Sequence, residues 1–178
     1  MSLAQHLSLE DRWYTPINII ESARTVLGPI TFDPASDESA NQFVAAQRYI
    51  TEQEDGLKTD WSTYDLSNVF LNPPGGKFGG RSKSILFWNT LMKNQPNLGH
   101  AIYVGFSIEQ LQTSQVKTLR SILDFPFCIP SRRLKYINGR DNSLCSPTHA
   151  SVIVYVPGRI NETKRFLEEF SQYGHCKS

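Results

Sequence analysis

Apolar residues recur along much of the chain at steps of three and four, the spacing that places them on one face of a helix. This spacing predicts helices at 17–27, 40–49, 82–92 and 161–173, and one more that carries Leu111, Val116 and Leu119. Pro16 and Gly28 flank the first of these helices, as is common at helix ends. Ser107, followed three residues later by Gln110, is typical of a capping box at the start of the Leu111 helix.

Short uninterrupted apolar runs separate these helices, and such runs predict buried strands. They lie at 29–33, 68–72, 101–106, 134–137 and 150–156. The last two enclose the polar, turn-rich stretch 138–147, so we expect an antiparallel hairpin at the edge of a sheet. The order of elements predicts an α/β fold with a mixed, mainly parallel sheet, helices on both faces and a C-terminal antiparallel hairpin.

Composition narrows the class of protein. A chain of 178 residues with 39% hydrophobic and 20% charged residues fits a single domain spanning 1–178. The net charge of +1 means that any nucleic-acid contact must use local basic groups. The three cysteines form no CxxC pair, so we expect reduced thiols and no metal site. No leader peptide and no long apolar run is evident, which predicts a cytoplasmic protein with no membrane partner.

Two of the predicted strands end in turns that carry polar side chains. Ligands of open α/β sheets bind beyond the carboxyl ends of the strands. The first turn is Asp33, Pro34, Ala35 and Ser36, and the second is Asn72, Pro73, Pro74 and Gly75. Taken alone, the first turn is more typical of a plain Asp-Pro turn, in which the carboxylate accepts hydrogen bonds from its own backbone.

The second turn has a more specific chemistry. Prolines lack an N–H group, so the Asn72 side-chain oxygen and the Pro73 carbonyl form a pair of acceptors with few competing donors. An exocyclic amine has two N–H donors that fit such a pair. Acceptors on both N–H groups would orient the nitrogen lone pair for attack on an electrophile. The turn therefore predicts an amine-binding site, with an ordinary turn as the alternative.

In their order along the chain, these segments resemble the phage-type DNA N6-adenine methyltransferase family. The resemblance rests on 11–16 (DRWYTP), 32–36 (FDPAS), 54–57 (EDGL), 60–61 (DW), 70–74 (FLNPP), 133–136 and 150–156. It implies a Rossmann-like methyltransferase fold, S-adenosylmethionine as the cofactor, and a DNA substrate whose adenine is flipped out of the duplex. It also implies a phage or prophage origin.

The resemblance also implies roles for individual residues. Thr15, Pro16 and the Asp33 turn would hold the amino-acid end of the cofactor, Asp55 and Leu57 would contact its adenine, and the catalytic set would be Asn72, Pro73 and Pro74. The full cofactor-binding set is Trp13, Thr15, Pro16, Asp33, Pro34, Ala35, Ser36, Asp55 and Leu57. The family usually has an aromatic residue after the two prolines to stack on the flipped base. This chain has Gly75 there, with Phe78 three residues on, and no acid is identified for the cofactor ribose.

Two basic clusters are candidates for contacts with DNA phosphates. The first follows the second turn and consists of Gly75, Lys77, Phe78, Arg81 and Lys83. The second is on the expected hairpin and consists of Arg132, Arg133, Lys135 and Arg140. A solvated loop and a charged edge strand are the respective alternatives. The segment 75–82 that contains the first cluster is similar to the phosphate-binding loop of nucleoside triphosphatases, but it has Arg81 at the position where that motif requires lysine.

Two other classes of function stay open. A methyltransferase-like fold can bind cofactor or DNA without catalysis, and an amine methyltransferase can act on a substrate other than DNA. Methylation of cytosine C5 is disfavoured because it needs a nucleophilic thiol, and neither turn has a cysteine nearby.

Overall fold

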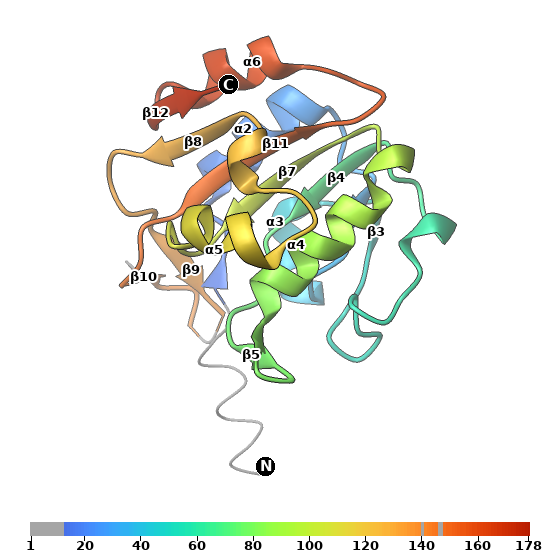
Figure 1. Ribbon diagram of the computed structural model, residues 1–178. Coiled ribbons are helices and arrows are strands. Elements are labelled where there is room, and N and C mark those ends of the chain that lie inside the picture. The colour runs from blue at the N-terminus through green and yellow to red at the C-terminus, as the bar shows by residue number, and fades with distance from the viewer. Residues whose placement is uncertain (1–12, 140, 146–147) are drawn as a thin grey trace.

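A computed structural model describes residues 13–139, 141–145 and 148–178 (Figure 1). Its centre is a seven-stranded sheet with the strand order β12-β8-β11-β7-β4-β2-β3. The strands are β2 (Phe32–Asp33), β3 (Arg48–Tyr49), β4 (Asn68–Leu71), β7 (His100–Gly105), β8 (Phe127–Pro130), β11 (Val152–Pro157) and β12 (Gly174–Lys177).

Five helices and three 3-10 turns accompany this sheet in the described part of the chain. The helices are α2 (Ile17–Leu27), α3 (Glu38–Val44), α4 (Lys83–Asn94), α5 (Gln110–Lys117) and α6 (Thr163–Phe170). The 3-10 turns are η1 (Trp61–Thr63), η2 (Gln95–Asn97) and η3 (Ile122–Asp124). Two small sheets complete the fold: β1 (Trp13–Tyr14) with β9 (Tyr136–Asn138) and β10 (Leu144–Cys145), and β5 (Lys77–Phe78) with β6 (Arg81–Ser82).

The sheet is mixed, with a parallel half and an antiparallel half. Strands β3, β2, β4 and β7 pair in parallel. Strands β7, β11, β8 and β12 pair antiparallel. The prediction of a mixed sheet is confirmed, whereas the prediction of a mainly parallel one is wrong. Strands β8, β11 and β12 come from the last third of the chain and form the antiparallel ladders. Short-range sequence patterns do not reveal these pairings.

The predicted C-terminal hairpin is also wrong. Strand β11 lies inside the sheet, between β7 and β8, while β9 pairs with β1 and β10 in a separate sheet. The physical reason is visible in β11 itself, where every residue from Val152 to Val156 is buried. Such a run must be covered on both faces, and that favours a central position over an edge.

Side chains along the central strands alternate between two hydrophobic clusters, one on each face of the sheet. Along β4, Val69 and Leu71 enter one cluster and Phe70 enters the other. Helix α4 supplies Phe87 and Trp88 to the first cluster. Helices α2 and α6 pack in the second, and Figure 1 shows α4 in front of the strands and α2 behind them.

The helical predictions at 17–27 and 82–92 agree closely with α2 and α4. The other three need correction. Helix α3 begins at Glu38 and ends at Val44, because Ala45 adopts a left-handed conformation (φ 52°) from which the chain enters β3. Helix α6 ends at Phe170, and the chain then pairs with β8 as β12.

The capping box predicted at Ser107 does not form. Helix α5 begins at Gln110 after Glu109 and has no side-chain cap, and the Gln110 side chain instead accepts a hydrogen bond from the buried Tyr103 hydroxyl (2.8 Å). Val116 is 81% exposed, and Leu119 lies beyond the end of α5 at Lys117, so this helix is shorter and buries less than its spacing suggests. In the described residues, no helix is both long and apolar enough to cross a membrane.

Candidate active site

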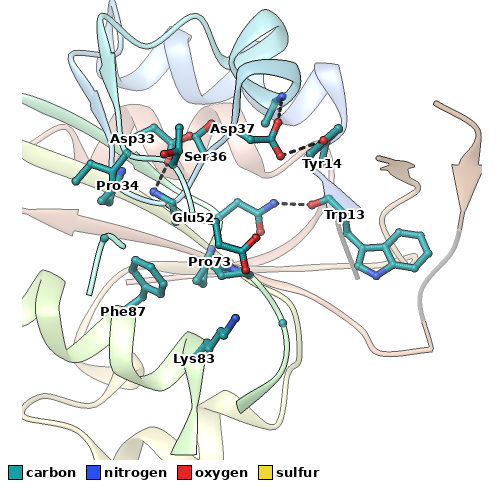
Figure 2. Close-up of a pocket in the computed structure, with 18 of the residues that line it drawn as sticks. Trp13, Tyr14, Asp33, Pro34, Ser36, Asp37, Glu52, Pro73, Lys83 and Phe87 are labelled. Carbon is teal, nitrogen blue, oxygen red and sulfur yellow. Dashed lines mark hydrogen bonds between the residues drawn. The ribbon is translucent and has the colours of Figure 1, made fainter. Parts of the chain in front are cut away.

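A cavity of about 940 Å³ opens beyond the carboxyl ends of the parallel strands. Its walls come from β1, the turns after β2 and β4, the loop after β3 and the start of α4. Because β2 lies beside β4 in the sheet, the Asp33 turn and the Asn72 turn meet at this cavity (Figure 2). The structure therefore brings together the two turns that the sequence singled out.

The orientation of the Asn72 side chain is fixed by a main-chain group from the start of the described chain. Its Nδ2 donates a hydrogen bond to the Trp13 carbonyl oxygen at 3.0 Å. A carbonyl oxygen can only accept, so the amide nitrogen must face Trp13 and the amide oxygen remains available as an acceptor. Pro73 is buried and Pro74 exposed, and both line the cavity beside Asn72.

Strand β1 and the residues after it form a second wall. The Tyr14 hydroxyl donates to Asp37 Oδ2 at 3.1 Å, while Asp37 Oδ1 caps α3 at the Ala40 N–H (2.8 Å). Thr15 is 3% exposed, and its hydroxyl oxygen is buried without a hydrogen-bond partner in the described structure. Pro16 is buried at the N-cap of α2 and lies behind the cavity lining, unlike the other residues of the predicted cofactor set.

The Asp33 turn presents a buried carboxyl to the cavity. Asp33 is 2% exposed, and its Oδ1 accepts a hydrogen bond from the Ala35 N–H at 3.1 Å. Burial raises the pKa of Asp33 to about 7, and the Ala35 N–H opposes this rise only in part. The Ser36 hydroxyl is within electrostatic reach of this carboxyl but makes no hydrogen bond of ordinary geometry.

The loop after β3 packs against the Asp33 turn through Gly56. A Cβ atom on Gly56 would lie 2.1 Å from the Pro34 carbonyl oxygen, so only glycine allows this approach. The buried Trp61 Nε1 donates to the Gly56 carbonyl at 2.7 Å and holds the loop in place. In the 60–61 segment, Trp61 therefore has a structural role as the anchor of this loop. Asp60 caps the η1 turn by accepting a hydrogen bond from the Ser62 N–H.

Both predicted residues of this loop line the cavity. The Asp55 carboxylate accepts from the Leu57 N–H (3.1 Å) and pairs with Lys58 Nζ (2.9 Å), and the Lys58 ammonium group lowers the Asp55 pKa. Several further lining residues were not predicted, among them Glu52 after β3 and Phe87 from α4. Glu52 could not be predicted from the sequence, because only the strand order of the sheet brings the end of β3 to the cavity. Figure 2 shows Glu52 between the Asp33 turn and Pro73.

A comparison with protein-family models adds an independent observation. The model of the DNA N-6-adenine-methyltransferase (Dam) family matches residues 4–156 of the 178-residue chain. The chain belongs to this family. The match includes every described wall of the cavity, from β1 to the start of α4. No curated protein and no solved structure matches the chain.

In this member of the family, the first basic cluster forms the rim of the cavity. Gly75, Lys77, Phe78 and Lys83 line the cavity, whereas Arg81 is exposed outside its lining. The segment is a tight hairpin of β5 and β6 rather than an irregular loop. Lys83 is half-buried as the first residue of α4, and Figure 2 places it on the α4 side of the cavity.

The second basic cluster is separate from the cavity of this methyltransferase. Arg132, Arg133 and Lys135 are exposed just before β9 and do not line the cavity, while Arg140 lies outside the described residues. No group of three or more histidine, cysteine, aspartate or glutamate side chains in the described chain could hold a metal ion.

Proposed function

We propose that this protein transfers the methyl group of S-adenosylmethionine to the N6 amine of an adenine that has been flipped out of DNA into the cavity. The observation that carries the proposal is the hydrogen bond from Asn72 Nδ2 to the Trp13 carbonyl. It leaves the Asn72 oxygen as an acceptor beside a cavity large enough for a nucleobase and a cofactor, and the carbonyl of the neighbouring Pro73 is the second proposed acceptor. We further propose that the mixed sheet and its helices form a Rossmann-like methyltransferase fold.

The polar groups of the cavity fit the amino-acid end of the cofactor. That end carries an ammonium group and a carboxylate, which need acceptors and donors respectively. The Asp33 carboxyl is buried, and the Thr15 and Ser36 hydroxyls are buried without hydrogen-bond partners in the described structure. A buried hydroxyl without a partner is costly, so a ligand that bonds to it gains affinity. Asp33 would hold the ammonium group, and Thr15 and Ser36 would bond to either group.

The rest of the cavity fits the nucleoside part of the cofactor. The Glu52 carboxylate, after β3, has the acceptors that a pair of ribose hydroxyls requires. Leu57 and Phe87 supply apolar surface to an adenine ring, and the bond from the Leu57 N–H to Asp55 fixes the turn that carries Leu57. The resemblance had assigned Asp55 to direct contact with this ring. In the structure its carboxylate is already engaged, so we assign it to shaping the turn.

The chemistry needs few groups from the protein. When bound, the cofactor supplies a methyl group on a positively charged sulfur. Asn72 Oδ1 and the Pro73 carbonyl would accept the two N–H groups of the target amine and turn its lone pair toward that methyl carbon. The same two oxygens would stabilise the positive charge that the amine gains when it takes up the methyl group and the electron pair of the C–S bond stays on sulfur. The amine then releases a proton to solvent.

Methyl transfer from radiolabelled S-adenosylmethionine to unmethylated duplex DNA tests this function directly, with the DNA digested to nucleosides afterwards. We expect the label in N6-methyldeoxyadenosine alone. Label in a cytosine derivative, or binding of the cofactor with no labelled nucleoside from duplex or single-stranded DNA, would refute the proposal.

A further inference from the structure

A base that leaves the duplex loses its stacking partners, and enzymes that flip bases replace them with aromatic or apolar side chains. Aromatic residues line the cavity at six described positions. Three of them are buried in its floor and walls, namely Tyr14, Phe70 and Phe87. The other three reach the solvent at least in part and are candidates for a stacking partner, namely Trp13, Phe78 and Phe106.

Two of the three exposed candidates already have other roles. Phe106 lies at the end of β7, where its ring packs against Tyr136 (centroids 6.1 Å apart) and His149 (5.6 Å). Trp13 holds Asn72 through its carbonyl oxygen, and Figure 2 shows its indole pointing away from the cavity. A base resting on the Asn72 and Pro73 acceptors would therefore need another aromatic face.

Phe78 provides that face. It lines the cavity, is 52% exposed, and has no aromatic ring packed against it among the described residues. Its ring lies near a cation, with Lys58 Nζ 5.9 Å from the ring centroid. Lys77 precedes it and Arg81 is its cross-strand partner, so exposed cations flank the ring as contacts with DNA phosphates would require.

The hairpin that carries Phe78 is short, and the residues at its base have open space around them. Gly79 and Gly80, with φ of 55° and 77°, close it with the two positive angles of a type I′ turn. The Lys83 N–H donates to the Gly76 carbonyl at 3.0 Å across its base. A Cβ atom on Gly75 or Gly76 would meet no atom within 4 Å, so the stem is uncrowded.

We propose that Phe78 is the positioning residue that stacks on the flipped adenine, and that the β5–β6 hairpin delivers its ring from the rim of the cavity. The inference rests on the proposed function and assigns to it one more residue. The absence of a side chain at Gly75 follows naturally, because an aromatic residue there would compete with Phe78 for the same base face.

The test is steady-state methylation of a long PCR-amplified duplex, with cofactor affinity measured separately by calorimetry. Phe78→Ala should lower kcat/KM for DNA by about 5- to 150-fold, the range expected for loss of one base–aromatic stack. Its affinity for S-adenosylmethionine should stay within about twofold of wild type. Phe78→Tyr should retain most activity. Leu119→Ala, which removes an exposed apolar side chain outside the cavity, should match wild type.

A relocation variant makes the test independent of any damage to the hairpin. Gly75→Phe combined with Phe78→Ala moves the ring into the open space at position 75, and we expect it to recover part of the lost kcat/KM. Wild-type activity in Phe78→Ala, or a parallel loss of cofactor affinity, would overturn the stacking role. A wild-type protein that labels no adenine would instead overturn the proposed function, so the two failures are distinguishable.

Discussion

At the scale of single residues, the candidate site depends on polar groups whose hydrogen bonds are incomplete. Asn72 has its amide nitrogen bound to Trp13 and its oxygen left as an acceptor. Thr15 and Ser36 have buried hydroxyls without partners in the described structure. Such groups reduce stability in the free protein, so their presence in one cavity favours a ligand that completes them.

Asn72→Ala should therefore separate chemistry from cofactor binding. Loss of one acceptor aimed at a developing charge lowers kcat by about 10²- to 10³-fold in comparable sites. We expect that loss in label transferred to DNA, with the Kd for S-adenosylmethionine changed by no more than a few-fold. Asn94→Ala, which removes the same side chain from the far end of α4, is the matched control. Turnover of Asn72→Ala at the wild-type rate would exclude the mechanism.

Asp33 couples the site to pH. Because burial raises the Asp33 pKa from 3.8 to about 7, the folded protein holds this proton more tightly than the unfolded chain does. The stabilisation that results is fully present below about pH 3.8 and is lost as the pH rises through about 7. Asp33→Asn removes this dependence. As the pH rises from about 4 to about 8, the free energy of unfolding of wild type should therefore fall relative to that of the variant by on the order of 1–4 kcal/mol. Urea titrations of both proteins across this range provide the measurement.

Cofactor binding should have the opposite pH dependence, because an ammonium group needs the ionised carboxylate. In wild type, the affinity for S-adenosylmethionine should rise as the pH increases through about 7. In Asp33→Asn it should be weaker by about tenfold or more at pH 8 and nearly independent of pH over this range. Calorimetric titrations at several pH values check both expectations, and an unchanged pH profile in the variant would show that Asp33 does not bind the ammonium group.

At the scale of elements, the walls of the cavity are held by contacts between loops. The loop after β3 reaches the Asp33 turn because Gly56 has no side chain and because Trp61 anchors the Gly56 carbonyl. This contact positions Leu57, which depends on the loop for its place in the cavity. The Asp33 turn and the loop after β3 therefore form one structural unit in the wall of the cavity.

Gly56→Ala should disrupt that unit. The added Cβ atom would lie 2.1 Å from the Pro34 carbonyl, so the loop must move away from the turn. We expect a loss of about 1–3 kcal/mol in the free energy of unfolding and at least a tenfold weaker Kd for S-adenosylmethionine. Gly75→Ala adds the same methyl group where nothing lies within 4 Å, and it should leave the free energy of unfolding unchanged. Equal stabilities for the two variants would contradict the assigned contact.

Which elements could be predicted from the sequence depends on how local their signals are. The two strand-end turns were predicted, because Asp33 and Asn72 directly follow apolar runs. Strands β8 and β12 were missed, since each depends on pairing with a distant segment rather than on its own pattern. The bond from Asn72 to Trp13 spans 59 positions and leaves no short-range signal. Glu52 was missed for the same reason, because the strand order alone places it at the cavity.

At the scale of the whole molecule, charge is nearly balanced, with a formal net charge of +1. A long-range field that attracts DNA is therefore weak, and binding must rely on local cations. Two exposed groups are available: Lys77 and Arg81 at the rim of the cavity, and the cluster Arg132, Arg133 and Lys135 before β9. Figure 1 shows β5 and β9 toward the same end of the molecule, beyond the carboxyl ends of β4 and β7.

The salt dependence of DNA binding tests whether both groups contact one duplex. Each phosphate contact contributes about 0.9 to the slope of log K against log salt concentration on duplex DNA. The double variant Arg132→Ala and Arg133→Ala should therefore reduce the slope by up to about 1.8, whatever the DNA sequence, because such contacts carry no sequence information. Its kcat at saturating DNA should stay near the wild-type value, since neither arginine lines the cavity.

Arg159→Ala is the control for that experiment. This exposed arginine follows β11, and its backbone N–H donates a hydrogen bond to the Leu98 carbonyl just before β7. It therefore lies at the end of the sheet remote from the cavity. It removes one positive charge where the double variant removes two, so a general loss of attraction would lower its slope by about half as much. A reduced slope in the double variant alone would mean that the duplex extends from the cavity rim to the segment before β9. Identical slopes in the double variant and wild type would restrict the DNA contacts to the β5–β6 hairpin and the cavity itself.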